Sequence, residues 1–436
     1  MNLLNNTPNQ HTLHICIINC DYSFLFAMDN LLMDKNCTIS CKDRIVGDFM
    51  KLKNLKIDLV WFDSMGAKSS CIFIETPDIR ILVDPGASGM QPSYPLPDLL
   101  KRYYNLKAHK EIEKAGRKAD ITIITHYHYD HHTLPSSKML DADALYRKKK
   151  LFVKNPNMYI NSSQWERARF FFNEILEKYG KSELDKNLVD QENASFPDPM
   201  EELPLASKKD YGDYNARKKE LIEKGRKWFR KLCDMWISNP WVPEIKLQNV
   251  EVEFADGKTF QFNDTTIRFT NPLFHGVEFD RVGWVIAFTV EYGGEKVLFS
   301  SDLQGPEIED YAAWIIDENP DFLVLDGPPT YLFGYMLNRI NLNRAVENLC
   351  WILSEVKTDV VIYDHHLLRD AKYRERVNKV YKVAERENKQ VLTAAEFLGN
   401  EPMIFKAIRW KEDEKVLEKY MENARKEMET KFRNSP

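Results

Sequence analysis

One short segment of the chain, ADITIITHYHYDHH, places four histidines and one aspartate directly after an apolar run. The run at 121–124 predicts a buried strand, and the polar residues follow at its end, where α/β sheets place their reactive groups. Imidazole and carboxylate groups at this density are typical of sites for Zn²⁺, Mn²⁺ or Fe²⁺. The segment therefore predicts a metal site that includes His126, His128, Asp130 and His131.

The spacing of these residues indicates two metal ions. His126 and His128 lie two residues apart on an irregular loop and can share one ion. Asp130 and His131 point elsewhere and can hold a second, whereas His132 lies outside the set. Two ions about 4 Å apart form the centre with which hydrolases stabilise an attacking and a leaving oxygen.

The spacing H-x-H-x-D-H resembles the second signature of the metallo-β-lactamase superfamily, and further pieces follow in the order that this family requires. His275 lies in NPLFHG, Asp302 in VLFSSDLQG, and a histidine pair in TDVVIYDHH, each after a strand-like run. Upstream, Asp84 in ILVDPGAS resembles the first signature, where an aspartate supports the metal-binding loop. Taken singly, each residue could be a cap or a turn residue; together and in order, they indicate one site.

The resemblance implies two sets of ligands, with Asp302 bridging them. One set is His126, His128 and His275. The other is Asp130, His131 and one of the pair His365 and His366. We prefer His365 as the ligand, which leaves His366 as a proton donor or a substrate contact.

Several segments are together similar to a narrower, archaeal family of proteins with the metallo-β-lactamase fold. This similarity covers about residues 52–405 and includes FDSMGAKSSCIFIETPDIRILVDPG, FVKNPNMYINSSQ, SSDLQGP, LDGPPTYLFGY and DHHLLRD. It implies an α/β fold, the four-layer αβ/βα sandwich, with the metals at one edge of two facing sheets. It implies no particular substrate.

A helical insert at about residues 160–240 is predicted within this fold, because 144 residues separate His131 from His275. Residues 181–207 are polar, and their prolines predict an excursion without helix, whereas 217–236 have the period of a helix. Residues 206–235 contain ten lysines and arginines against five aspartates and glutamates. This stretch could bind a phosphate-rich substrate or a partner subunit, or it could be a solvated helix face.

Both ends of the chain differ from the domain at 50–405. Residues 1–49 are predicted to be a non-native or disordered extension, because MKLKNLKIDLVWFD at Met50 begins the recognisable domain. Two C-x₃-C pairs in this segment offer a zinc module as the alternative. Residues 406–436 predict a charged C-terminal helix, which could pack on the body or, like the insert, form a homo-oligomer contact.

Composition narrows the class of protein. The 436 residues are 43% hydrophobic and 29% charged, and the net charge of −5 gives no indication of non-specific nucleic-acid binding. No apolar run reaches 18 residues, so we expect no membrane span. The start of the chain lacks the pattern of a signal peptide, and seven cysteines, an odd number, suit a reducing compartment. A cytoplasmic location is the expectation.

The predicted function is metal-dependent hydrolysis with two Zn²⁺ ions, or Mn²⁺ or Fe²⁺ in their place. The expected substrate is a small molecule or a nucleic acid, and its reacting group is expected to be a phosphodiester. The alternatives are hydrolysis of a lactone or thioester, or a non-catalytic assembly or regulatory role. Only 63 residues separate Asp302 from His365, which argues against the nuclease branch that inserts a large domain there. An iron redox role is disfavoured because flavin-linked relatives commonly have a carboxylate where this chain has His128.

Other residues are candidates for contacts with water and substrate. Asp130 could orient the attacking water while it coordinates. The loop DGPPTYLFGY offers Asp326, Thr330 and Tyr331, although Asp-Gly-Pro-Pro is equally natural as a plain turn. Arg369 could face an anion or could pair with Asp370.

Overall fold

The computed structural model describes residues 45–46, 49–191 and 194–431. The predicted N-terminal extension, with its C-x₃-C pairs, therefore lies outside the described residues except for three positions, Ile45, Val46 and Phe49. All of these described residues fall in one compact unit, Arg44–Pro436.

The first sheet runs through the N-terminal half of this unit. Its strands are β1 (Ile45–Val46), β2 (Phe49–Lys51), β3 (Lys56–Phe62), β4 (Ser70–Glu75), β5 (Arg80–Val83), β6 (Ile121–Ile124), β7 (Lys149–Val153), β8 (Ile245–Leu247) and β9 (Val250–Phe254). Within the described residues their order is β1-β2-β3-β4-β5-β6-β7-β9-β8. β5, β6, β7 and β9 pair in parallel, so their carboxyl ends share one edge of the sheet.

The second sheet is formed by the C-terminal half. Its strands are β10 (Thr259–Phe262), β11 (Thr265–Phe269), β14 (Phe288–Tyr292), β15 (Glu295–Phe299), β16 (Phe322–Asp326), β17 (Val360–Asp364) and β18 (Gln390–Leu392), adjacent in this order. The last four pair in parallel. A separate ribbon pairs β12 (Leu273–Phe274) with β13 (Trp284–Val285).

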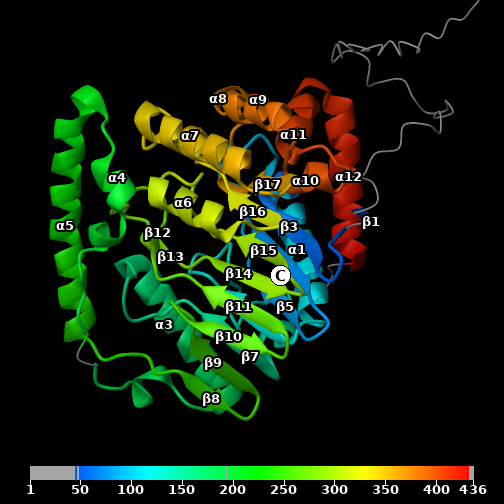
Figure 1. The fold of residues 1–436 in the computed structure, drawn as a ribbon. Helices are drawn as coiled ribbons and strands as arrows, with labels where there is room; N and C mark the ends of the chain where they lie inside the picture. Colours follow the sequence, from blue (N-terminus) through cyan, green and yellow to red (C-terminus); the bar gives the residue numbers. More distant parts are fainter. Residues whose placement is uncertain (1–44, 47–48, 192–193, 432–436) are drawn as a thin grey trace, which may run out of the picture. The chain divides into compact units, whose positions relative to one another are not determined.

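Helices cover the outer faces of the two sheets (Figure 1). The helices are α1 (Asp98–Gly116), α2 (Asp143–Tyr146), α3 (Ser162–Ile175), α4 (Pro204–Lys208), α5 (Asn215–Ser238), α6 (Glu309–Glu318), α7 (Arg339–Glu355), α8 (Tyr373–Arg376), α9 (Asn378–Arg386), α10 (Ala394–Phe397), α11 (Met403–Glu412) and α12 (Glu414–Lys431). Side chains of α1 and α3 share a buried core with β4, β6 and β7. Those of α6, α7 and α9 share another with β15, β16 and β17.

The inner faces of the two sheets pack on each other. β6, β16 and β17 are buried along their whole length, as expected for strands covered on both sides. Phe152 of β7 stacks on Phe260 of β10, with ring centroids 3.9 Å apart. The predicted four-layer αβ/βα sandwich is therefore confirmed. Among the described helices, none combines the length and apolarity that crossing a lipid bilayer requires.

The insert is more ordered than its prolines suggested. Pro204 does not break a helix but begins one, because a proline in the first turn loses no hydrogen bond. In α5 the buried residues are Gly225, Phe229, Leu232 and Trp236. Trp284 lies near this face and stacks on Trp228 of α5, with 5.5 Å between ring centroids. Figure 1 shows α5 as a long helix beside α4 and the β12–β13 ribbon.

The stretch before the turn at Gly293 is divided between two strands, β13 and β14, and β14 forms an antiparallel hairpin with β15. The division lies at Ile286, whose N–H donates to the carbonyl of Thr125 at 3.1 Å. The chain thus leaves the ribbon to contact the loop that follows β6.

Candidate metal centre

The side chains that could bind metal follow the ends of strands in both sheets. Asp84, His126, Asp302 and His365 come directly or within three residues after β5, β6, β15 and β17. Asp84, Ser301 and His365 have the left-handed backbone conformation, with φ of 45°, 52° and 61°. L-residues rarely adopt this conformation unless the surrounding structure holds it. The chain therefore turns sharply off these strands, just where the candidate ligands lie.

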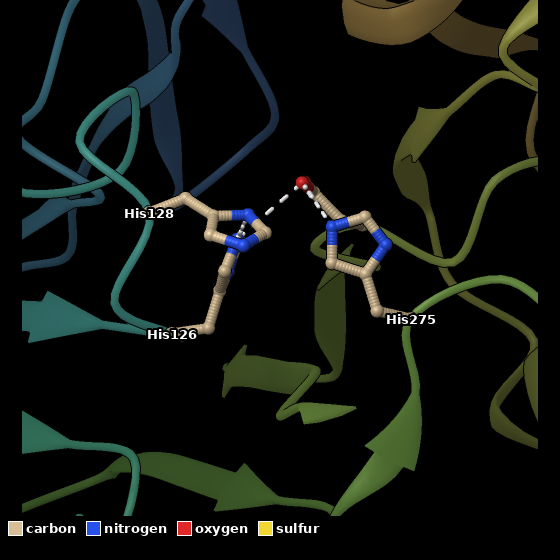
Figure 2. A group of neighbouring side chains, drawn as sticks. His126, His128 and His275 are labelled. Carbon is tan, nitrogen blue, oxygen red and sulfur yellow. Dashed lines mark hydrogen bonds and ion pairs between the residues drawn. The ribbon is translucent and has the colours of Figure 1, made fainter. Parts of the chain in front are cut away.

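His126, His128 and His275 form the first group of candidate ligands. His126 Nε2 lies 3.0 Å from His128 Nδ1. Figure 2 shows these two rings on one loop and the His275 ring facing them from another. One ligand atom from each ring and one from Asp302 all lie within 4.8 Å of one another. The structure thus brings together residues that are 149 positions apart in the chain, from His126 to His275.

Asp130, His131 and His365 form the second group. Their ligand atoms also lie within 4.8 Å of one another. His131 Nε2 is 3.2 Å from His365 Nε2, and His365 Nε2 is 3.9 Å from Asp130 Oδ2. The loop after β6 therefore contributes to both groups, as its spacing suggested.

Asp302 lies between the two groups. Its Oδ2 is 3.1 Å from His275 Nε2, 3.2 Å from His131 Nε2, and 3.5 Å from Nε2 of both His126 and His365. Asp302 and His275 are 1% exposed, yet neither Asp302 oxygen nor His275 Nε2 has a hydrogen-bond partner within the described residues. A buried carboxylate in this state is costly. Four imidazoles converging on such a carboxylate fit the donor set of a divalent transition metal.

Burial determines the protonation of two histidines in the first group. It lowers the pKa of His126 and of His128 well below the usual range for imidazole. Both rings are therefore neutral at physiological pH and keep a lone pair that can bind a metal ion. The side-chain amide of Gln304 lies 3.1 Å from His275 Nδ1 and holds that ring on its far side.

Two buried aspartates hold the histidines of the second group from behind. Asp84 Oδ2 lies 2.8 Å from His131 Nδ1, and Asp84 also accepts hydrogen bonds from the N–H and hydroxyl of Thr125. Asp63 Oδ1 lies 2.8 Å from His365 Nδ1. Because a carboxylate accepts, each ring carries its proton on Nδ1 and turns Nε2 towards the centre.

Asp63 was not among the residues predicted from the sequence. It is fully buried and also accepts a hydrogen bond from Arg369 Nε at 2.6 Å. Burial raises the pKa of Asp63, but the charges of Arg369 and His365 lower it more and hold it well below its usual range. The signal that could have found this residue is its place in FDSMG, directly after β3.

His366 and Asp326 form a pair beside the centre. His366 Nδ1 lies 3.0 Å from Asp326 Oδ2, and the His366 backbone N–H donates to Asp326 Oδ1. A ligand atom of His366 lies within 4.8 Å of those of Asp302 and His365. Burial, and then the negative charge of Asp302, raise the pKa of Asp326 to about 8.

The remaining predicted residues lie on the same side. Arg369 Nη2 donates to Asp130 Oδ2 at 3.2 Å, so Arg369 pairs with Asp130 and Asp63 rather than with Asp370. The Tyr331 ring lies 5.9 Å from the Arg369 guanidinium. Thr330 is fully buried, and its hydroxyl lacks a partner in the part of the chain described.

Gly86 sets the distance between the turn after β5 and the loop after β6. A Cβ on this residue would lie 2.3 Å from His132 N and 2.7 Å from His131 N. We expect Gly86→Ala to push these segments apart, to lower the free energy of unfolding by about 1–3 kcal/mol and to weaken metal binding. Urea denaturation and metal analysis of the purified variant would measure both effects.

Gly89→Ala provides the matched control, because a Cβ there meets no atom within 4 Å. We expect its stability and metal content to equal those of the wild type. Equal behaviour of Gly86→Ala and Gly89→Ala would show that the close approach at Gly86 does not determine the position of His131.

The loop that carries His275 also joins the insert to α7 through buried charges. Glu278 on this loop lies 2.8 Å from Arg344 Nη2, and Lys218 of α5 pairs with the same carboxylate. Arg344 Nη2 also donates to Glu309 Oε2 at 2.7 Å. Breaking such a buried pair is costly, so this network holds α5 against the His275 loop.

Ion pairs engage part of the basic stretch predicted at 206–235. Within the described residues, five of its ten cations have a carboxylate partner: Lys209, Arg217, Lys218, Lys224 and Arg226. These pairings weaken the case for an arm that binds nucleic acid through its charge, because paired cations attract phosphate less.

Glu307 is a buried carboxyl beside this network. It is 2% exposed, and its Oε1 has no partner within the described residues. Burial, and then the charge of Asp280, raise its pKa to about 8. The folded state therefore holds this proton more tightly than the unfolded state, where the pKa of glutamate is about 4.3. The stability it contributes is full below that value and is lost as the pH rises towards 8.

We expect Glu307→Gln to gain stability over the wild type by about 1.4 kcal/mol per pH unit between about pH 5 and 8. Urea denaturation at a series of pH values would measure the difference. Glu385→Gln, at an exposed position, is the control and should show no such trend. A constant difference for Glu307→Gln over this range would contradict the raised pKa.

A family model described as the Metallo-beta-lactamase superfamily matches residues 66–132. UPF0282 proteins are similar over most of the chain. The one from Methanopyrus kandleri is 32% identical over 355 residues, covering 80% of this chain and 95% of the relative. The one from Korarchaeum cryptofilum is 32% identical over 337 residues, covering 77% and 87%.

Solved structures also match, with low scores. CmlA, a diiron beta-hydroxylase from Streptomyces venezuelae, is 13% identical, with a TM-score of 0.34 over 76% of this chain and 51% of its own. The MIM-2 metallo-beta-lactamase is 10% identical, with a TM-score of 0.28 over 79% and 84%. The family resemblance seen in the motifs is confirmed by the sequence relatives. The chain belongs to the UPF0282 family, within the metallo-β-lactamase superfamily.

Proposed function

We propose that this protein is a hydrolase that uses two divalent metal ions. The observation that carries the proposal is the environment of Asp302. This buried carboxylate has no hydrogen-bond donor among the described residues, and four imidazole nitrogens lie within 3.5 Å of it. Membership of the metallo-β-lactamase superfamily and the groups of candidate ligands support a metal-dependent, hydrolase-like function.

The proposed ligands divide as the two groups do. His126, His128 and His275 would hold one ion, and Asp130, His131 and His365 the other, with Asp302 between them. His365 is preferred to His366 because it lies with Asp130 and His131, and because Asp63 orients it. Bound Zn²⁺ would lower the pKa of a water molecule and polarise a carbonyl or phosphoryl oxygen; Mn²⁺ and Fe²⁺ suit the same donors.

The residues of the chain would then position water and move a proton. Asp130 accepts from Arg369 through Oδ2, which leaves Oδ1 to accept from the attacking water. Because the pKa of Asp326 is raised to about 8, its protonated carboxyl would donate to His366 Nδ1. The proton of the neutral ring would then lie on Nε2, the atom that would pass it to the leaving group. Among the described residues, neither Asp130 Oδ1 nor His366 Nε2 has a hydrogen-bond partner, which leaves both atoms for these roles.

The substrate can be tested by its reacting centre. The experiment is hydrolysis of bis-p-nitrophenyl phosphate, a thioester and a lactone by protein that is dialysed against EDTA and then reloaded with Zn²⁺ or Mn²⁺. We expect one class of substrate to be hydrolysed, and only after the metal is restored. The phosphodiester is the class that we expect to react. Two bound metals with no turnover of any class would count against hydrolysis and favour an assembly or regulatory role.

A further inference from the structure

Lys68 is a half-buried lysine beside the second group of candidate ligands. Its backbone pairs with Ser88, and the next residue, Ser69, places its carbonyl 3.1 Å from His365 Nδ1. Ser69 N–H also donates to Asp63 Oδ1 at 2.9 Å. The segment that carries Lys68 is thus packed directly against His365 and Asp63.

The ammonium of Lys68 has no acceptor in the described part of the chain, where no hydrogen bond or ion pair involves it. The charges of Arg369, Asp130 and Asp63 act on the pKa of this ammonium: Arg369 lowers it, and the two aspartates raise it. Burial, and then the charge of Arg369, lower the pKa of Lys68. Two cations that repel each other in a half-buried place would be stabilised by an anion between them.

Arg369 is the second cation that could bind this anion, and part of its guanidinium is already engaged. Asp63 and Asp130 engage its Nε and Nη2. Its Nη1 donates to no acceptor among the described residues and is not one of their buried unpartnered atoms, so solvent reaches it. The ring of Tyr331 lies 5.9 Å away on the same guanidinium, and the Tyr331 hydroxyl likewise makes no hydrogen bond within the described chain.

We propose that Lys68, Arg369 and Tyr331 form a binding site for a phosphate group of the substrate, next to Asp130 and His365. This inference rests on the proposed hydrolase function and names its class of substrate, a phosphorylated molecule or a phosphodiester. Three separate donors match the several free oxygens of a phosphate, whereas a carboxylate offers only two. The charge of Arg369 is already oriented by two aspartates, so little ordering is left to the ligand.

The test is binding of inorganic phosphate, measured by isothermal titration calorimetry on EDTA-dialysed and on Zn²⁺-loaded protein. We expect binding to both forms. Lys68→Gln should weaken it about ten- to a hundredfold, the effect of losing a charge-assisted hydrogen bond. Lys68→Arg should restore most of the affinity, and Tyr331→Phe should weaken it about tenfold.

Lys231→Gln makes the same change of net charge at an exposed position of α5 and should leave the affinity unchanged. Thermal unfolding without phosphate would show that each variant is folded. Phosphate binding only to the Zn²⁺-loaded form, and equally to Lys68→Gln, would overturn the proposal, since the metals alone would then bind it. So would tighter binding of acetate than of phosphate. Zinc content and ester turnover are measured separately, so failure of this site is distinguishable from failure of the hydrolase proposal.

Discussion

Asp302→Asn is expected to lose metal and to reduce hydrolysis by about a thousandfold or more, the effect of removing several kcal/mol of charge stabilisation. The side chain keeps its size, but the carboxylate that lies within 3.5 Å of four imidazole nitrogens loses its charge. The amide would also turn an N–H₂ group towards the atoms that should face the metals. Metal analysis and turnover of the reloaded variant would measure the two effects.

Asp213→Asn is the matched control, because it makes the same chemical change at an exposed residue of the insert. Its metal content and turnover should equal those of the wild type. If Asp302→Asn retained two metals and full activity, Asp302 would not bridge them, and the two groups of ligands would have to be independent.

The ligand candidates could be predicted because they obey a local rule. In a parallel sheet the carboxyl ends of the strands meet at one edge. An apolar run followed by histidine or aspartate therefore indicates where a side chain will lie, whatever the path of the chain between the runs. His126, Asp302 and His365 each follow such a run, and the structure brings them together.

The supporting contacts could not be predicted in the same way, because they join distant segments. Asp63 and His365 are 302 residues apart, and Arg369 is 306 residues from Asp63. Gln304 meets His275 across 29 residues of chain, and the two residues follow different strands, β15 and β12. The sequence shows each residue after its own strand but contains no local signal for the pairing.

The choice between His365 and His366 depends on backbone conformation. His365 has φ of 61°, a left-handed residue at the end of β17. This turn directs His365 to Asp63 and His131, and His366 to Asp326. Left-handed conformations of residues other than glycine are held by tertiary contacts, for which the sequence contains no local signal. The two adjacent histidines therefore look equivalent in the sequence.

The charge of the insert likewise could not be interpreted from the sequence alone. Composition predicted a basic stretch, but its effect depends on which cations remain free. Lys218 is 17% exposed at its side chain and pairs with Glu278, 60 residues further along. A count of charges cannot separate such a buried cation from one that attracts a ligand.

Asp63→Asn is expected to destabilise the fold and the second group of ligands together. Arg369 is 8% exposed, and Asp63 accepts its Nε–H at 2.6 Å, so the variant leaves a buried guanidinium with one partner fewer. Removing one partner of a buried ion pair costs about 3–5 kcal/mol. His365 loses its carboxylate acceptor as well, and loss of such a contact lowers metal affinity by about 10–100-fold.

A double-mutant cycle separates these two effects. If the stability loss arises from the Arg369 charge, Asp63→Asn combined with Arg369→Met should recover part of it in urea denaturation, whereas metal affinity should stay low because His365 is still unsupported. The depressed pKa of Asp63 predicts how its effect on stability depends on pH. The ionised carboxylate contributes to the free energy of unfolding above about pH 4, and this contribution is lost as the pH falls. The stabilities of the wild type and of Asp63→Asn should therefore become equal in acid. Additive losses in the double variant, or a gap in stability that persists in acid, would mean that Asp63 acts through His365 alone.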